Sequence, residues 1–275
     1  MIDLHTHSTA SDGTYSPAAL VDLAADRKLS ALALTDHDSL AGLREAQAEA
    51  LRRGLRFIPG VEIEVDFSPG EFHLLGLDLR DTEGVILKTI DRLALSRDQR
   101  NERIFERMRA AGIPGNYAEL RDAAEGGMIG RPHIADYLIA RKVVRKKQDA
   151  FDRYLGKGRP FYVAKECMEL KEAIGVIREA GGIPVVAHPL SLFVSWTRLA
   201  SLFLEWKDLG IEGIEAWHPT ARPGHCRRLE KMARDLGFRV TAGSDFHGAN
   251  RPDRRLGYTA GDIPIQDSYL EALDR

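Results

Sequence analysis

The stretch Met1-Ile2-Asp3-Leu4-His5-Thr6-His7 is a short apolar run that ends in two histidines one residue apart. Far along the chain, the apolar run Phe238-Arg239-Val240-Thr241-Ala242 leads in the same way into Gly243-Ser244-Asp245-Phe246-His247. Side chains at positions i and i+2 of an extended strand point to the same face, so each pair can direct two ligand atoms at one ion. We interpret the two pairs as halves of one metal site.

Four further apolar, β-branched-rich segments carry a histidine or a carboxylate at or just beyond their ends. These groups lie in Thr35-Asp36-His37-Asp38, Pro59-Gly60-Val61-Glu62-Ile63-Glu64, Phe72-His73-Leu74-Leu75-Gly76 and Val185-Val186-Ala187-His188-Pro189. A parallel α/β barrel collects its functional groups at the ends of its strands. The pattern therefore predicts a metallohydrolase of the α/β class.

Strands and helices alternate through both ends of the chain. Ser16 and Pro17 are typical of the N-cap and first position of a helix over 18–28, and Gly54 is expected to end a helix over 40–53. The remaining elements are predicted at 31–34, 55–58, 71–77, 170–180, 183–187, 196–209, 213–217, 224–236 and 238–242. About seven strands result, in a mainly parallel sheet closer to an incomplete or distorted barrel than to a doubly wound sheet.

Residues 91–165 interrupt this alternation with helical, charged sequence. A long helix is expected to open at Ser96–Asn101 and run toward Ala110, and the stretch also contains Gly130-Arg131-Pro132-His133 and the basic run 141–147. We predict a barrel domain of residues 1–90 and 166–275 and a helical insertion domain of residues 91–165. The basic run is by composition a solvated helix face, although it is also suited to recruiting an RNA end.

Composition narrows the class of protein without naming a function. The chain has 275 residues, a formal net charge of −2 and a pI near 6.5. These values argue against a stable double-stranded DNA partner, because tight sequence-blind binding normally requires a basic domain. No apolar stretch approaches the roughly 20 residues that span a bilayer, so we expect a cytoplasmic protein with no membrane partner. Cys167 and Cys226 are expected to be reduced thiols.

The joint pattern of histidines favours a metal centre over isolated polar residues. Six of the nine histidines fall at predicted strand ends, where they are joined by Asp12, Glu62 and Asp245. Imidazole and carboxylate ligands without thiolate suit zinc, manganese or iron, and this many donors imply more than one ion.

These motifs, taken in order and spacing, resemble those of the polymerase and histidinol phosphatase (PHP) superfamily. The resemblance implies a distorted (β/α)7 barrel with three divalent ions, manganese foremost, that cleaves phosphoesters. It implies one ion on His5, His7, Glu62 and Asp245, a second on Glu62, His73 and His188, and a third on Asp12, His37 and His247, with Glu62 as the bridge. Asp12 departs from the pattern, since some relatives have histidine there.

The insertion resembles the branch of 3′,5′-nucleotide bisphosphate phosphatases, some of which are also 5′-to-3′ exoribonucleases on short RNA. Arg131 and His133 would then hold substrate phosphates, since a guanidinium matches a phosphate bidentately, and His218 is a weaker contact candidate. A plain surface arginine is the alternative for Arg131.

Several groups beside the ligands have expected supporting roles. Asp36, Asp38 and Glu64 would orient His37 or a metal-bound water. Glu215 fits two interpretations equally well, a further supporting carboxylate and a solvated charge at a strand end. His225 is expected to be structural.

The expected reaction is attack on phosphorus by a metal-bound hydroxide in line with the ester oxygen. The substrate would be a small nucleotide bisphosphate, such as adenosine 3′,5′-bisphosphate, or the end of a short RNA. Two alternatives remain open at this level: a histidinol-phosphate-type phosphatase, and a non-catalytic, metal-stabilised module like those attached to bacterial DNA polymerases.

Overall fold

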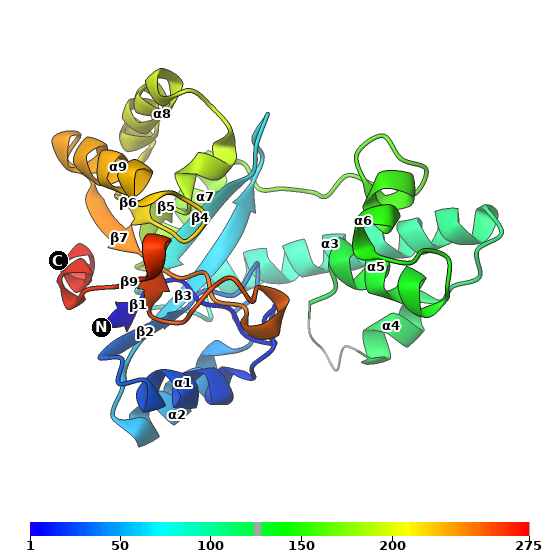
Figure 1. The fold of residues 1–275 in the computed structure, drawn as a ribbon, viewed down its shortest axis with the longest axis horizontal. Coiled ribbons are helices and arrows are strands. Elements are labelled where there is room, and N and C mark those ends of the chain that lie inside the picture. The colour runs from blue at the N-terminus through cyan, green and yellow to red at the C-terminus, as the bar shows by residue number, and fades with distance from the viewer. Residues whose placement is uncertain (124–127, 275) are drawn as a thin grey trace. The chain divides into compact units, whose positions relative to one another are not determined.

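The computed structural model describes residues 1–123 and 128–274. The chain forms two compact units, Met1–Ile90 with Cys167–Arg275, and Asp91–Glu166 (Figure 1). Among the described residues, no helix combines the length and apolar character needed to cross a membrane. We refer below to the barrel unit and the insertion unit.

A seven-stranded sheet forms the centre of the barrel unit, with its strands side by side in chain order. They are β1 (Ile2–Asp3), β2 (Ala31–Leu34), β3 (Arg56–Val65), β4 (Phe72–Leu77), β5 (Ile183–Val186), β6 (Gly213–Trp217) and β7 (Arg239–Ala242). The two edges meet through a parallel bridge between Thr6 and Phe246. There His7 N donates to Phe246 O at 3.0 Å, and Asp245 N donates to His5 O at 2.9 Å. The predicted distorted barrel of seven strands is confirmed.

Strand β4 runs antiparallel to both of its neighbours, while the other neighbouring pairs are parallel. His73 therefore lies near the beginning of its strand, not at the end as the sequence suggested. Because β4 is reversed, its beginning falls at the same edge of the sheet as the ends of the parallel strands.

Glu62 also differs from its predicted place beyond a short strand. β3 continues through it to Val65, because residues 60–65 pair with β4 in the register Glu62↔Leu75 and Glu64↔His73. Glu62 is thus an internal strand residue, and its bridge partner on the β2 side is His37.

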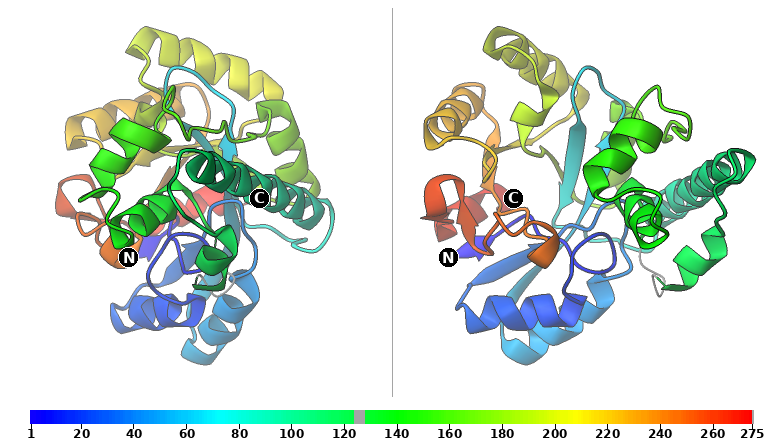
Figure 2. Two further views of the ribbon diagram at one scale, coloured as in Figure 1. Left: turned by 90° about the vertical axis from the view of Figure 1, so that its right-hand side faces the viewer. Right: turned by 45° about the vertical axis from the view of Figure 1, so that its right-hand side comes forward.

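Helices surround this sheet on its outer side, as both views of Figure 2 show for the blue and the yellow-to-orange segments. They are α1 (Pro17–Asp26), α2 (Leu43–Arg53), α7 (Leu170–Glu179), α8 (Trp196–Leu209) and α9 (Pro223–Asp235). Ser16 Oγ accepts from Ala19 N at 3.2 Å as the predicted cap of α1, and Gly54 ends α2 at φ 67°. Helix α2 begins three residues later than residue 40, where the sequence placed it.

Burial on both faces explains why the strands are nearly all apolar. Every residue of β2, β5 and β6 is buried. Side chains such as Leu32 and Val185 are fully enclosed, because helices cover the outside of the barrel and the inward side chains fill its interior. Short 3₁₀ turns and a two-stranded hairpin of β8 (Tyr258–Thr259) and β9 (Ile263–Pro264) complete the unit.

The insertion unit contains helices and no strand among its described residues. Its elements are the greater part of α3 (Val85–Ala110), α4 (Tyr117–Ala123), α5 (Arg131–Ala140), α6 (Lys147–Ala150) and a π-helical turn, η1 (Phe151–Leu155). A core of its own forms around Phe105, Met108 and Leu138. Helix α3 begins at Val85, before the start predicted at Ser96, because Ile86, Ile90 and Leu93 continue its buried face and no glycine or proline interrupts 85–95.

Candidate metal centre

The donor atoms of eight of the predicted ligands form three overlapping clusters at one edge of the barrel. The clusters are His5, His7, Glu62 and Asp245; His7, Asp12, His37 and His247; and His37, Glu62 and His73. Within each cluster the ligand atoms lie within 4.8 Å of one another. The ninth, His188, joins them through Glu62, with its Nε2 atom 2.9 Å from Glu62 Oε1.

Glu62 stands at the centre, and its two oxygens face different histidines. Oε1 lies 2.9 Å from His73 Nδ1 and 2.9 Å from His188 Nε2. Oε2 lies 3.2 Å from the Nε2 atoms of both His5 and His7. A buried carboxylate divided in this way has the geometry of a bridge between two ions.

Asp245 and Asp12 extend the arrangement on either side of His7. Asp245 Oδ1 lies 3.1 Å from His7 Nε2, and Asp12 Oδ1 lies 3.1 Å from His247 Nε2. The imidazole rings of His7 and His247 stack with centroids 4.1 Å apart. His7 is therefore shared between two of the clusters.

Three carboxylate oxygens in these clusters are buried and accept no hydrogen bond: Asp12 Oδ1, Glu62 Oε2 and Asp245 Oδ1. Imidazole nitrogens lie 3.1–3.2 Å from each of these oxygens without a hydrogen bond to it, and a bound cation would remove the cost of burying the anionic oxygens. All three oxygens belong to ligand clusters, so the residues present fit a group of divalent ions.

The charges of the clustered groups act on one another. Burial would lower the pKa of His7, but the carboxylates of Asp245 and Glu62 raise it to about 10. Burial lowers the pKa of His37 to about 4. Burial would raise the pKa of Glu62, but the surrounding imidazoles, His37 first, hold it well below its usual range. The centre is thus prepared to keep its carboxylates ionised.

Glu215 is a buried supporting residue, which corrects its interpretation as a solvated charge. Its Oε1 lies 3.0 Å from His5 Nδ1, and its Oε2 accepts from His188 N at 2.8 Å. An Nδ1–H of His5 donated to Glu215 leaves the Nε2 lone pair free for an ion. The sequence signal for this role is the position of Glu215 inside the apolar strand β6.

Asp36 was expected to orient His37 or a metal-bound water, but in the structure it contacts the loop that follows His7. It accepts hydrogen bonds from Ser8 N at 2.8 Å, Ser8 Oγ at 2.7 Å and Ser11 Oγ at 2.5 Å. Ser11 Oγ in turn lies 3.4 Å from His7 Nδ1. Asp36 therefore reaches His7 through Ser11 and shapes the loop that carries Asp12.

The turns at this edge are sterically demanding. His188 and Asp245 have φ of 27° and 50°, a region that L-residues rarely occupy. A Cβ atom at Gly243 would lie 2.3 Å from His5 Cβ, so only glycine allows the turn after β7 to come this close to His5. Such strain at strand ends is a common feature of functional sites.

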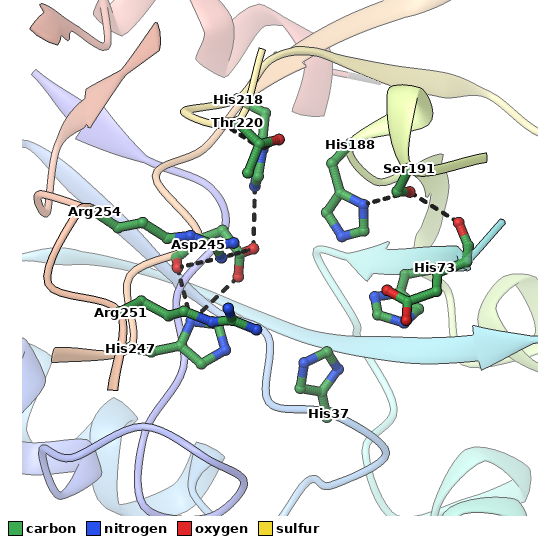
Figure 3. Close-up of a pocket in the computed structure, with 11 residues that line it drawn as sticks. His37, His73, His188, Ser191, His218, Thr220, Asp245, His247, Arg251 and Arg254 are labelled. Carbon is green, nitrogen blue, oxygen red and sulfur yellow. Dashed lines mark hydrogen bonds and ion pairs between the residues drawn. The ribbon is translucent and has the colours of Figure 1, made fainter. Parts of the chain in front are cut away.

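The clusters open into a cavity of about 250 Å³ (Figure 3). Its walls include His37, His73, His188, His218, Asp245 and His247 from the predicted set, together with Glu71, Ser191, Thr220, Arg251 and Arg254, which the sequence did not single out. The Nε2 atom of His218 lies 3.1 Å from Asp245 Oδ2, and its Nδ1 atom lies 2.8 Å from Thr220 Oγ1.

The other predicted substrate contacts lie in the insertion unit. Arg131 begins α5, and its guanidinium carbon lies 5.7 Å from the ring centroid of Tyr162. His133 Nδ1 accepts from Gly130 N at 3.0 Å and so caps the start of α5. His225 packs its ring edge against Trp196 in the barrel unit, at a centroid distance of 5.5 Å.

A seven-stranded barrel with imidazoles and buried carboxylates gathered at one edge defines a metal-dependent hydrolase of the α/β barrel class. The chain belongs to the PHP domain family, whose model matches residues 3–155. Members of this family of metal-dependent phosphoesterases use divalent ions, in keeping with the clustered donors.

Named relatives match over nearly the whole chain. The 3′,5′-nucleoside bisphosphate phosphatase of Chromobacterium violaceum is 34% identical over 96% of this chain and 93% of its own length. The 5′-3′ exoribonuclease of Haemophilus influenzae is 34% identical over 97% of this chain and 98% of its own length. A solved structure described as an amidohydrolase from Chromobacterium violaceum, with bound sulfate and no metal, superimposes with a TM-score of 0.84 at 33% identity, covering 99% of this chain and 95% of that one.

Proposed function

We propose that this protein is a metal-dependent phosphoesterase that removes the 3′-phosphate from nucleoside 3′,5′-bisphosphates, for example converting adenosine 3′,5′-bisphosphate to AMP and phosphate. The proposal rests on the buried carboxylate of Glu62, whose two oxygens face different histidines. Of these histidines, His73 and His188 line the cavity into which the clusters open. The relative from Chromobacterium violaceum named for this reaction supports the choice of substrate.

We assign three ions to the centre, with manganese as the preferred metal and zinc or iron as alternatives. His5, His7, Glu62 and Asp245 would hold the first, and Glu62, His73 and His188 the second. Asp12, His37 and His247 would hold the third. The buried carboxylate oxygens without a hydrogen bond support the first and third ions, because Glu62 Oε2 and Asp245 Oδ1 belong to the first group and Asp12 Oδ1 to the third. For the second ion Glu62 offers its other oxygen, Oε1, which lies 2.9 Å from both His73 Nδ1 and His188 Nε2.

Divalent ions supply activated water near neutral pH and neutralise charge on the phosphoryl oxygens. The chain itself orients the ligands: Glu215 fixes the ring of His5, and Asp36 acts on His7 through Ser11. Thr220 holds the ring of His218 at the cavity wall, where its other nitrogen faces Asp245. Arg131 and His133 would bind the phosphate that does not react and so select a doubly phosphorylated nucleotide.

A second candidate activity is 5′-to-3′ exoribonuclease action on short RNA. The relative from Haemophilus influenzae named for that activity covers almost the whole chain at the same identity as the phosphatase. Both reactions break a phosphoester bond, so one centre can serve both.

The test is a comparison of substrates with the manganese-loaded protein. Adenosine 3′,5′-bisphosphate, the corresponding monophosphates, histidinol phosphate and a 5′-phosphorylated short RNA are assayed side by side for kcat/KM. We expect the bisphosphate to be the best small substrate. Preference for histidinol phosphate would replace the proposal by the histidinol-phosphate alternative, and no turnover of any substrate by metal-loaded protein would favour the non-catalytic alternative.

A further inference from the structure

Arg251 is an exposed arginine that lines the cavity and whose guanidinium has no partner among the residues that the structure describes. No described hydrogen bond or ion pair involves its side chain. Its backbone N donates to Gly248 O at 3.2 Å, and its backbone O accepts from Arg254 N at 3.1 Å. Figure 3 shows the side chain extending past His247 toward His37. A cation is therefore presented to the cavity without an anion to neutralise it.

The two arginines that follow in the chain behave differently. Arg254 is half-buried and is held by Asp245, donating to the backbone oxygen at 3.0 Å and also to the carboxylate. Arg255 pairs with Asp262 at 3.5 Å and lies over the ring of Tyr258. Both have side-chain partners, whereas Arg251 has none among residues 1–123 and 128–274.

The backbone just before Arg251 is hydrogen-bonded to the loop that contains Asp12. Thr14 N donates to His247 O at 3.2 Å, and Ala249 N donates to Thr14 Oγ1 at 3.0 Å. Asn250 Nδ2 donates to Asp12 O at 2.7 Å. These contacts hold the backbone of Arg251 beside the cluster of Asp12, His37 and His247.

An arginine beside a group of divalent cations is repelled unless an anion lies between them. A phosphoryl group on the ions has oxygens left over, and a guanidinium binds such oxygens with two parallel hydrogen bonds. We propose that Arg251 binds the reacting phosphoryl group and is a catalytic residue of the phosphoesterase proposed above, on which this inference rests.

The role is electrostatic and involves no proton transfer by Arg251. In the reaction, the oxygen of water forms a bond to phosphorus, the bond from phosphorus to the 3′ oxygen breaks, and the departing oxygen takes up a proton. The charge on the phosphoryl oxygens that do not leave is redistributed in the transition state. The guanidinium of Arg251 beside those oxygens would stabilise that charge and lower the barrier. Arg131, by contrast, is assigned to the phosphate that does not react.

The test compares Arg251→Ala and Arg251→Lys with the control Arg255→Ala, an exposed arginine of the same loop that does not line the cavity. Turnover is measured with a nucleoside 3′,5′-bisphosphate, a nucleoside 3′-monophosphate and p-nitrophenyl phosphate. A second readout is the Kd of inorganic phosphate for the manganese-loaded protein, measured by calorimetry. Metal content and Tm are measured for each variant.

We expect Arg251→Ala to lower kcat/KM for all three substrates by about ten- to a hundredfold and to weaken phosphate binding, with metal content and Tm unchanged. Arg251→Lys should recover part of the loss, because the charge remains while the bidentate geometry is lost. Arg255→Ala should match the unmodified protein.

Two results overturn the proposal. Unchanged phosphate Kd in Arg251→Ala would show that the residue does not bind this group, and a loss confined to the bisphosphate would place it at the phosphate that does not react. Failure of the proposed function is a separate result: the unmodified protein then fails to turn over the bisphosphate. In that case the phosphate Kd of the variants still decides the role of Arg251.

Discussion

The Oε1 atom of Glu215 lies 3.0 Å from the Nδ1 atom of His5, and both side chains are buried at the end of the barrel. Burial would raise the pKa of Glu215, but His5 lowers it, so the carboxylate stays ionised beside the imidazole. This contact selects the tautomer of His5 that presents Nε2 to the metal centre. It links strand β6, in the second half of the chain, to a ligand in the segment just after β1.

Glu215→Gln should therefore weaken metal binding by about ten- to a hundredfold without removing a ligand. The amide loses the negative charge that fixes the His5 ring and can offer only one acceptor oxygen to His5 Nδ1 and His188 N. Metal affinity is measured by competition with a chromophoric chelator. Glu212→Gln is the matched control, since Glu212 lies just before β6 with a partly exposed side chain; equal affinity in the two variants would contradict the role of Glu215.

Metal analysis tests the centre directly. After reconstitution the protein should hold at least two divalent ions per chain, because Glu62 presents separate oxygens to two sets of histidines. Removal with a chelator should abolish turnover and lower the Tm, since an ion at a hundred times its Kd stabilises the folded state by about 2.7 kcal/mol. A folded protein that takes up no metal would end the hypothesis.

Glu62→Gln should abolish activity together with metal binding. The amide has nearly the same shape but lacks the charge that two ions would share, and a neutral oxygen is a weaker ligand. Metal content, turnover and far-UV circular dichroism are measured on the same sample, so that loss of the ions is separated from loss of the fold. Near-normal metal content and turnover would show that Glu62 is not a bridge.

Arg131→Ala should affect one substrate class and leave the metal content unchanged. If Arg131 binds the phosphate that does not react, kcat/KM for a nucleoside bisphosphate should fall by roughly 1.5–3 kcal/mol of lost charge-assisted hydrogen bonding. Turnover of p-nitrophenyl phosphate should stay constant, which is the opposite of the pattern expected for Arg251. Equal losses on both substrates would move Arg131 to the reacting phosphoryl group, and no loss would leave it a surface arginine.

Asp3 provides a test of stability against pH. Its Oδ1 accepts from Ser244 N at 2.9 Å and its Oδ2 from Gly257 N at 2.7 Å, and burial raises its pKa from 3.8 to about 6. A raised folded-state pKa means that the stability contributed by this carboxyl is complete below pH 3.8 and is lost as the pH rises through about 6.

In Asp3→Asn this titration is absent. The difference in unfolding free energy between the unmodified protein and the variant should therefore shrink by about 1 kcal/mol between pH 5 and pH 7. Urea unfolding of both metal-free proteins at the two pH values measures it. A difference that is constant or grows with pH would contradict the assigned pKa.

Local sequence rules predicted the elements whose signals are local. Helix α8 and strand β6 have the predicted bounds, and Ser16 and Gly54 begin and end their helices as expected. These features depend on residues a few positions apart. The start predicted for α3, at Ser96, was wrong. The sequence before Ser96 contains no signal that stops a helix, and it lacks an obvious cap that would have indicated an earlier start.

The reversed direction of β4 depended on tertiary structure. A strand of either direction has the same alternating pattern, so the sequence of residues 72–77 does not report it. The same pairing drew Glu62 into β3 and brought His73 to the edge where the other donors lie. Supporting residues depended on tertiary structure for a similar reason. The sequence left the role of Glu215 open and did not single out Arg251, because their neighbours come from strands and loops distant in sequence.

The sequence by itself determined the barrel class and the chemistry of its donors, because alternating apolar runs ending in histidine and carboxylate carry that information locally. Only the tertiary structure decided how those donors are shared: which oxygen of Glu62 faces which imidazole, that Glu215 orients His5, and that Arg251 has no partner among the described residues. The physical reason is that hydrogen bonds and charge interactions act over a few ångströms in space, between residues that can be more than two hundred positions apart in the chain.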